Sequence, residues 1–322
     1  DNLETKGYSS AIFDGRYVYY VPFATKKGRH ARILRYDTKK SFTSRKSWSA
    51  YDAQKIAGRR AMGYIGAAFD GRYIYFAPFG YKPYAHALVL RYDTKQNFKS
   101  GNSWQVYNAQ KTDGLVTKGY YGTGYDGRYV YFVPFNDGNT FHGRVLRYDT
   151  RKNFKNSSSW EAYNAAGTNG LNTVGYKGAV YDGKYIYFVP FRNNQSIHTN
   201  ILRYNTKGNF KNASSWTAYN ASFTDNLSTK GYVGAEKIDK YIYFIPYSGD
   251  YNKFHAKFLR YNTQKPFQNA SGWSAYKASN IDGLTTKGYK YSASDGKYLY
   301  FAPYHNGKSF SGIALRFNTK GN

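Results

Sequence analysis

Asp126-Gly-Arg-Tyr-Val-Tyr-Phe-Val-Pro-Phe135 is repeated almost letter for letter by five other stretches of this chain. Aligned on the tyrosine after the basic residue, the six copies lie 56 residues apart, with 57 before the last: Tyr17, Tyr73, Tyr129, Tyr185, Tyr241 and Tyr298. A fixed period of this length is typical of a repeat architecture. We therefore expect a single domain over residues 1–322, made of six units that start near residues 7, 63, 119, 175, 231 and 288.

Each unit contains four short segments with the composition of β-strands. The first is a Gly-Tyr-x-Gly segment such as Gly63-Tyr-Ile-Gly-Ala-Ala68, and in five units an Asp-Gly pair, a strong hairpin signal, follows it. The second, Arg128-Tyr-Val-Tyr-Phe-Val-Pro-Phe135, is apolar on both alternating faces, which predicts a strand covered on both sides. The third and fourth are represented by His142-Gly-Arg-Val-Leu-Arg-Tyr-Asp-Thr150 and Ser159-Trp-Glu-Ala-Tyr163.

Four antiparallel strands per unit, repeated around an axis, describe a β-propeller, in which only short protected edges remain. We predict an all-β, six-bladed β-propeller with four-stranded antiparallel blades. The tryptophans of the fourth strands occur five times, at Trp48, Trp104, Trp160, Trp216 and Trp273, so the last blade is expected to lack its outer strand. A linear solenoid is the alternative, but it should have atypical ends, whereas the first and last units here look like the others.

The order Asp-Gly-(Arg/Lys)-Tyr, then Leu-Arg-Tyr-Asp-Thr, then Trp resembles the repeat of kelch-type propellers and covers every unit. The resemblance implies propeller architecture, and sugar-binding propeller lectins supply a functional analogy. The chain departs from the kelch pattern because Pro-Phe or Pro-Tyr replaces the double glycine and the period exceeds the usual ~50 residues. Architecture alone does not assign function.

The composition is strongly basic, with 47 Lys and Arg against 19 Asp and Glu and a formal charge of +28. This excess predicts attraction to polyanions such as acidic polysaccharide, nucleic acid or an anionic cell surface. The chain has no cysteine, which excludes disulfides and thiolate metal sites, and no apolar run reaches the roughly 18 residues that span a membrane.

The chain starts at a unit boundary, as a mature, processed protein does, because its first residues match later linkers between units. We therefore expect an extracellular or secreted protein. In a eukaryotic secretory route, six Asn-x-Ser sequons would accept glycans: Asn156, Asn194, Asn212, Asn220, Asn226 and Asn269.

Antiparallel order brings the linkers and the variable loops after the second strands to one face, where binding residues usually lie. On that face we predict one ligand-binding cluster per blade. The clusters contain the tyrosines of the Gly-Tyr pairs (Tyr8, Tyr64, Tyr120, Tyr176, Tyr232 and Tyr289), the histidines that begin the third strands (His30, His86, His142, His198 and His255) and linker lysines (Lys6, Lys118, Lys230 and Lys287). Each second strand also ends in an aromatic residue, namely Phe23, Phe79, Phe135, Phe191, Tyr247 or Tyr304.

Aromatic faces stack on sugar rings, while Lys and His bind hydroxyl, carboxylate or sulfate groups. Repetition of weak sites on one body raises avidity by roughly 10² to 10⁴. The same aromatics and histidines are equally suited to packing between blades and capping strands. The arginine after the leucine of each third strand is expected to bridge blades: Arg35, Arg91, Arg147, Arg203, Arg260 and Arg316.

These features predict a multivalent, lectin-like binder of acidic or sulfated polysaccharide, with glycans or other polyanions as partners. We expect no catalytic residue, no metal and no cofactor. A glycosidase needs two carboxylates in different environments, and only three glutamates are present, Glu4, Glu161 and Glu236. A Gly-x-Ser-x-Gly nucleophile motif is also missing.

Three alternatives stay open. A polysaccharide lyase would use Tyr or His as base and Arg or Lys to neutralise a uronate carboxylate. A non-specific nucleic-acid binder would also combine basic and aromatic side chains. An extracellular matrix or adhesive protein would instead self-associate.

Overall fold

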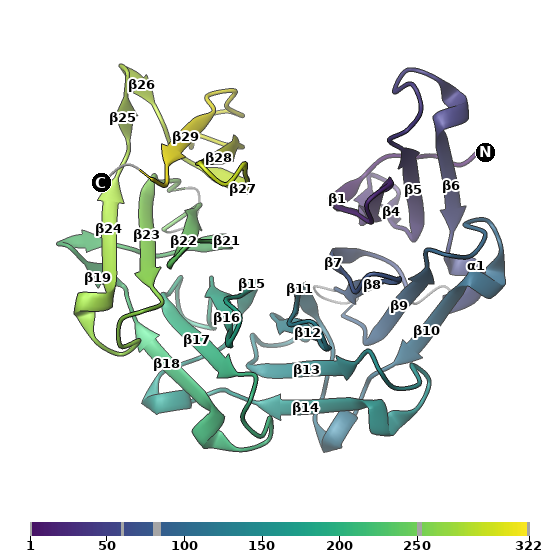
Figure 1. Ribbon diagram of the computed structural model, residues 1–322, viewed down its shortest axis with the longest axis horizontal. Helices are drawn as coiled ribbons and strands as arrows, with labels where there is room; N and C mark the ends of the chain where they lie inside the picture. The colour runs from purple at the N-terminus through teal and green to yellow at the C-terminus, as the bar shows by residue number, and fades with distance from the viewer. Residues whose placement is uncertain (1, 59–60, 80–84, 250–252, 321–322) are drawn as a thin grey trace. The chain divides into compact units, whose positions relative to one another are not determined.

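The computed structural model describes residues 2–58, 61–79, 85–249 and 253–320 (Figure 1). Over these ranges six antiparallel sheets follow one another along the chain, five with four strands and the last with three. The protein is a six-bladed β-propeller, and the sixth blade has no outer strand within the described residues. Both predictions from the sequence are confirmed.

The strands of each blade follow in chain order from the inner to the outer position. Blade 1 contains β1 (Tyr8–Phe13), β2 (Tyr17–Pro22), β5 (Arg32–Asp37) and β6 (Trp48–Asp52); blade 2 contains β7 (Tyr64–Phe69), β8 (Tyr73–Pro78), β9 (Leu88–Asp93) and β10 (Trp104–Asn108); blade 3 contains β11 (Tyr120–Tyr125), β12 (Tyr129–Pro134), β13 (Arg144–Asp149) and β14 (Trp160–Asn164). Blade 4 contains β15 (Tyr176–Tyr181), β16 (Tyr185–Pro190), β17 (Asn200–Asn205) and β18 (Trp216–Asn220); blade 5 contains β21 (Tyr232–Ile238), β22 (Tyr241–Pro246), β23 (Lys257–Asn262) and β24 (Trp273–Lys277); blade 6 contains β27 (Tyr289–Ser294), β28 (Tyr298–Pro303) and β29 (Leu315–Asn318).

Short elements connect these strands. Three short hairpins have strands of only two residues each. They pair β3 (Ala24–Thr25) with β4 (Gly28–Arg29), β19 (Phe223–Thr224) with β20 (Leu227–Ser228), and β25 (Asn280–Ile281) with β26 (Leu284–Thr285). The helical turns are α1 (Gln54–Ala57) and the 3₁₀ helices η1 (Arg45–Ser47), η2 (Gly101–Ser103), η3 (Thr112–Gly114), η4 (Ser157–Ser159), η5 (Thr168–Gly170), η6 (Ala213–Ser215) and η7 (Ala270–Gly272). Within the described ranges, no helix is long and apolar enough to cross a membrane.

The chain forms two compact units of three blades each. Unit 1 comprises Asp1–Thr140 and Arg144–Asn164, and unit 2 comprises Phe141–Gly143 and Ala165–Asn322. The expectation of a single domain over the whole chain stays a prediction.

The repeated Asp-Gly turn is fixed by its own aspartate. In blade 3, Asp126 Oδ1 accepts the backbone N–H groups of Arg128 at 2.8 Å and Tyr129 at 2.6 Å, and Oδ2 accepts the Tyr131 hydroxyl at 2.6 Å. Gly127 has a φ of +94°, a conformation that favours glycine. Hydrogen bonding within the turn thus gives this repeated carboxylate a structural role.

The aromatic residues of the outer strands form the interface between successive blades. Trp160 stacks on Tyr107 of the preceding blade, with ring centroids 4.5 Å apart, and lies 4.7 Å from Tyr148 of its own blade. Its Nε1–H donates to the carbonyl oxygen of Phe154 at 2.9 Å. The high tyrosine and tryptophan content therefore serves largely to join one blade to the next.

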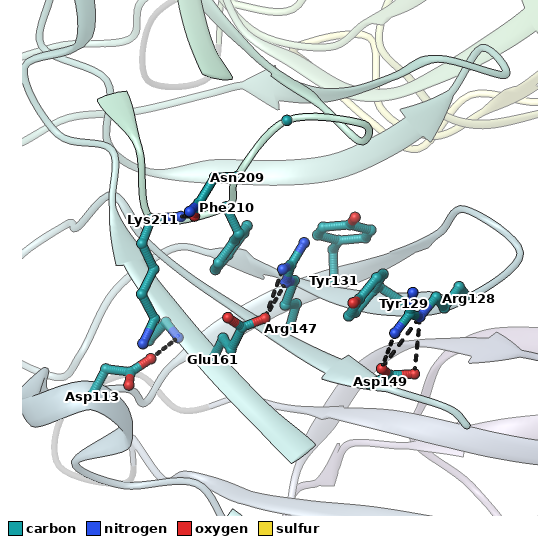
Figure 2. A network of polar contacts seen from close by, with 12 residues as sticks. Asp113, Arg128, Tyr129, Tyr131, Arg147, Asp149, Glu161, Asn209, Phe210 and Lys211 are labelled. Atoms are coloured by element: carbon teal, nitrogen blue, oxygen red, sulfur yellow. Dashed lines mark hydrogen bonds and ion pairs between the residues drawn. The ribbon is translucent and has the colours of Figure 1, made fainter. Parts of the chain in front are cut away.

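The arginine of each third strand has a structural environment, as the sequence predicted. In blade 3 the Nε and Nη2 groups of Arg147 donate to Glu161 Oε2 at 2.8 and 2.6 Å, and its guanidinium lies 4.1 Å from the Tyr129 ring centroid (Figure 2). In blade 1 the equivalent Arg35 lies 4.3 Å from Phe98 of the next blade. In blades 1, 2 and 4 this arginine thus contacts a phenylalanine of the next blade.

Candidate functional site

The tyrosines of the Gly-Tyr pairs lie in the interior. Five of them have no exposed surface: Tyr64, Tyr120, Tyr176, Tyr232 and Tyr289. Tyr8 is half-buried, and burial raises its pKa to about 12. Because a sugar cannot stack on a ring that solvent does not reach, the predicted glycan contact of the five buried tyrosines is corrected to a packing role inside the blades. The predicted contact of Tyr8 stays a prediction.

The histidines that precede the third strands are largely inaccessible to solvent. His30, His86, His142 and His198 are buried, and His255 is half-buried. In His198, Nε2 lies 2.8 Å from the carbonyl oxygen of Val174 in the preceding linker, and Nδ1 accepts the backbone N–H of Asn200 at 3.1 Å. Because Nδ1 is an acceptor, the ring is the neutral Nε2–H form, which donates to Val174.

The same pair of contacts recurs at His30, His86 and His255. Burial lowers the pKa of His86, His198 and His255 to about 4. At these positions both ring nitrogens are used and the ring is uncharged at neutral pH. The prediction that His30, His86, His198 and His255 hold an anionic ligand is therefore corrected: their rings tie the preceding linker to the third strand.

The predicted lysines lie nearer to solvent. Lys6 is exposed and forms an ion pair with Glu4 at 2.7 Å, while Lys118, Lys230 and Lys287 are half-buried in the linkers. These linker lysines stay predicted ligand contacts.

A different set of residues combines aromatic surface with positive charge. In each unit the aromatic residues that follow the second strands contact one another in series. Phe79 lies 5.9 Å from Phe23 and 6.0 Å from Phe135 in unit 1, measured between ring centroids. In unit 2, Tyr247 lies 6.1 Å from Phe191 and 5.9 Å from Tyr304, and these three rings are partly exposed. We call the row Phe191, Tyr247 and Tyr304 the aromatic row of unit 2.

Two lysines that sequence reasoning missed lie over this row. Lys177 of β15 places Nζ 3.5 Å from the Phe191 ring centroid and 5.3 Å from that of Tyr247. Lys290 of β27 places Nζ 4.9 Å from the Tyr304 centroid. Among the described residues, no carboxylate forms an ion pair with Lys290. Cations over aromatic faces gain roughly 0.5–2 kcal/mol, more when water is excluded.

Burial disfavours the charged form of both lysines. Burial, with repulsion from Lys290 as the second cause, lowers the pKa of Lys177 to about 7. Burial also lowers the pKa of Lys290 and raises that of Tyr247 to about 12, the nearby Tyr304 hydroxyl adding to the latter shift. An anion bound between the two ammonium groups would offset both penalties. We refer to Lys177, Lys290 and the aromatic row of unit 2 as the lysine–aromatic site.

Unit 1 has a related arrangement with an arginine. The Arg29 guanidinium lies 5.6 Å from Phe23 and 5.5 Å from Phe79, and its Nη1 donates to the carbonyl oxygen of Phe79 at 3.3 Å. Tyr121, at the position equivalent to Lys177, packs between Phe79 and Phe135 with centroid distances of 5.4 and 5.0 Å. Each unit therefore carries aromatic rings with a cation over them.

A sequence signal for the lysines existed in the variation of the repeat. The two lysines occupy the position after the Gly-Tyr pair. Along the six repeats, this position holds Ser9, Ile65, Tyr121, Lys177, Val233 and Lys290. A position that changes inside an otherwise constant motif is where a site can differ from one blade to the next.

In the described part of the chain, no group of three His, Cys, Asp or Glu residues is placed to hold a metal ion. Comparison of the sequence with known families and with curated proteins finds no match. The resemblance to kelch-type propellers thus concerns architecture, and the site itself must indicate the function.

Proposed function

We propose that this propeller binds acidic carbohydrate at the lysine–aromatic site. The observation that carries the proposal is the placement of Lys177 and Lys290 over one row of partly exposed aromatic rings. A carboxylate or sulfate group would lie between the two ammonium groups, and the apolar face of the sugar would pack on Tyr247 or Tyr304. The formal charge of +28 supports the same ligand class, because it draws polyanions to the surface.

The aromatic rings distinguish binding of an acidic sugar from binding of a small inorganic anion. A small inorganic anion would use the lysines alone, whereas a sugar ring also gains from the tyrosine faces and from hydrogen bonds with their hydroxyls. The Arg29 arrangement in unit 1 would provide a second contact of the same kind.

Replacing both lysines, as Lys177→Gln with Lys290→Gln, is expected to weaken binding of an acidic oligosaccharide by about 100-fold. A hydrogen bond to a charged group contributes about 1.5–3 kcal/mol, and about 1.4 kcal/mol is tenfold in affinity. The measurement is titration of wild type and variant with a panel of acidic and neutral oligosaccharides at about 0.15 M and about 0.5 M salt, with single-stranded DNA alongside. Lys207→Gln, an exposed lysine of the same unit, is the matched control and should change affinity less than about twofold.

Equal losses in the double variant and the control would contradict the site. Binding to every polyanion that disappears at high salt would mean that net charge acts alone, as in non-specific nucleic-acid binding.

A second candidate function is favoured by the lowered pKa of Lys177. An amine with a pKa of about 7 is partly neutral at physiological pH and can act as a base. In β-elimination of a uronate polymer it would take the proton on the carbon next to the carboxylate. That electron pair would form the new C=C bond, and the glycosidic C–O bond would break with its electrons going to the leaving oxygen, which Tyr247 or Tyr304 could protonate. Ultraviolet absorbance of an unsaturated product would reveal this activity, and its absence alongside saturable binding would leave the binding function.

A further inference from the structure

A pocket of about 300 Å³ lies between blades 4 and 5 of unit 2. It lies at the opposite end of β16 from the lysine–aromatic site, because Tyr185 of its lining begins this strand whereas Phe191 follows the strand's last residue. Three cationic side chains are among those that line it: Lys184, Arg203 and Lys265. We call it the cationic pocket.

The lysine from blade 4 has lost the carboxylate partner that its counterparts have. In blade 3 the equivalent residue is Arg128, which forms an ion pair with Asp149 at 2.7 Å (Figure 2). Blade 4 has Asn205 in place of that aspartate and Lys184 in place of the arginine. Asn205 Oδ1 still accepts the backbone N–H of Lys207 at 3.2 Å, as the aspartate does in its own turn. The change therefore keeps the turn and removes the negative charge.

The lysine from blade 5 has lost its partner in the same way. In blade 1 the equivalent Lys40 places Nζ 3.9 Å from Asp37 Oδ2. Blade 5 has Asn262 at the position of that aspartate. The Tyr261 hydroxyl donates to the carbonyl oxygen of Lys265 at 2.6 Å, which fixes the turn that carries this lysine. Two aspartate-to-asparagine changes in successive blades thus act on one pocket.

The arginine has lost an acidic partner as well. In blade 3, Arg147 Nη2 donates to Glu161 Oε2 at 2.6 Å (Figure 2). In blade 4, Thr217 occupies the position of that glutamate, and its Oγ1 accepts from Arg203 Nε at 2.8 Å. A neutral hydroxyl thus replaces a carboxylate beside this guanidinium.

These three changes leave the pocket with an excess of positive charge. Among the described residues, no carboxylate forms an ion pair with any of the three cations. Lys184 Nζ and the Arg203 guanidinium lie over the same ring, 5.1 and 4.1 Å from the Tyr185 centroid. Asp182 also lines the pocket, but its oxygens already accept two backbone N–H groups of its turn and the Tyr187 hydroxyl.

We propose that the cationic pocket binds a tetrahedral oxyanion, the sulfate or phosphate group of an anionic ligand. Such a group presents oxygen atoms in several directions, which suits cations from three separate segments: the residue before β16, the strand β17 and the turn after β23. The planar guanidinium of arginine binds these groups through two parallel hydrogen bonds, and lysine adds a point charge. The pocket is separate from the lysine–aromatic site, and neither site depends on the other.

Calorimetric titration with inorganic sulfate and with inorganic phosphate tests the pocket. The full chain carries Lys177→Gln and Lys290→Gln, so that the lysine–aromatic site does not contribute to the signal. We expect saturable binding of one ion per chain. Adding Lys184→Gln and Lys265→Gln, which replace exposed side chains, should weaken this binding at least about tenfold.

A second variant restores the missing charge and removes no cation. Asn205→Asp places a carboxylate beside Lys184, as Asp149 lies beside Arg128 in blade 3. It should also weaken binding of either ion at least about tenfold. Lys207→Gln is the matched control, because it changes the net charge by the same amount at an exposed residue outside the pocket lining, and it should change affinity less than about twofold.

A sulfated and a phosphorylated monosaccharide distinguish the two sources of the group. Tighter binding of one ester than of its inorganic ion, lost in Asn205→Asp, supports the proposal and identifies the ligand class. Equal losses in Asn205→Asp and Lys207→Gln would mean that net charge alone attracts the ions, which overturns it. The absence of saturable binding up to about 20 mM of either ion also overturns it.

Discussion

Trp160→Ala is expected to lower the free energy of unfolding by about 3–5 kcal/mol, the range for removing a buried large aromatic side chain. The ring is 2% exposed and packs on Tyr107 of the preceding blade as well as on Phe132 and Tyr148 of its own. The substitution leaves a cavity and removes the donor to the Phe154 carbonyl oxygen. Equilibrium urea unfolding of wild type and variant measures the loss.

Trp48→Ala provides the matched control. Trp48 is only partly buried, and within the described part of unit 1 no tyrosine of a preceding blade stacks on it. The control should therefore lose less stability than Trp160→Ala. Equal losses would mean that contacts within a blade dominate and that the stacking between blades contributes little.

Acidification from about pH 7.5 to about pH 5 is expected to destabilise the protein strongly through its buried histidines. The folded-state pKa of His86, His198 and His255 is about 4, below the ordinary value of 6.5. Between these values the unfolded chain binds more protons than the folded one, so stability is fully present above about pH 6.5 and is lost as pH falls toward about 4. For His198 alone the shift corresponds to roughly 3 kcal/mol over the whole window.

Urea midpoints at about pH 7.5, about pH 6 and about pH 5 measure this effect, because these values lie on both sides of the ordinary histidine pKa. His198→Gln is the matched variant, because it removes one titrating ring and should flatten part of the pH dependence. A midpoint that stays constant over this range would show that the rings are not held neutral.

The fold could be predicted from the sequence because each repeat contains the turn and strand patterns that specify its local structure. The Asp126-Gly127 pair specifies a turn that its own side chain completes, and the alternation in the following strand specifies burial on both faces. The absence of a sixth tryptophan likewise predicted the three strands that the last blade has in the described part of the chain. The short hairpins and 3₁₀ turns were not predicted, because elements of two or three residues are too short to show a periodic pattern in the sequence.

The candidate site was predicted less well for a physical reason. Residues such as Tyr120 and His198 recur in nearly every repeat because each blade must fill its interior and hydrogen-bond its linker in the same way. The residues that repeat in nearly every blade are therefore structural residues. Lys177 and Lys290 occupy the variable position of the motif, and their lowered pKa values arise from burial and, for Lys177, also from repulsion by Lys290, which only the folded chain brings about.

The most direct test of acidic-carbohydrate binding at the lysine–aromatic site is proton uptake on binding. At a pH of about 8, Lys177 with its pKa of about 7 is mostly neutral, and an anion bound beside it would raise that pKa and draw a proton from the buffer. Calorimetric titration with an acidic oligosaccharide in two buffers of different ionisation enthalpy measures the uptake. We expect most of one proton per site for the wild type and none for Lys177→Gln, which should also bind more weakly. Binding of the same affinity in both proteins, without proton uptake, would contradict the site.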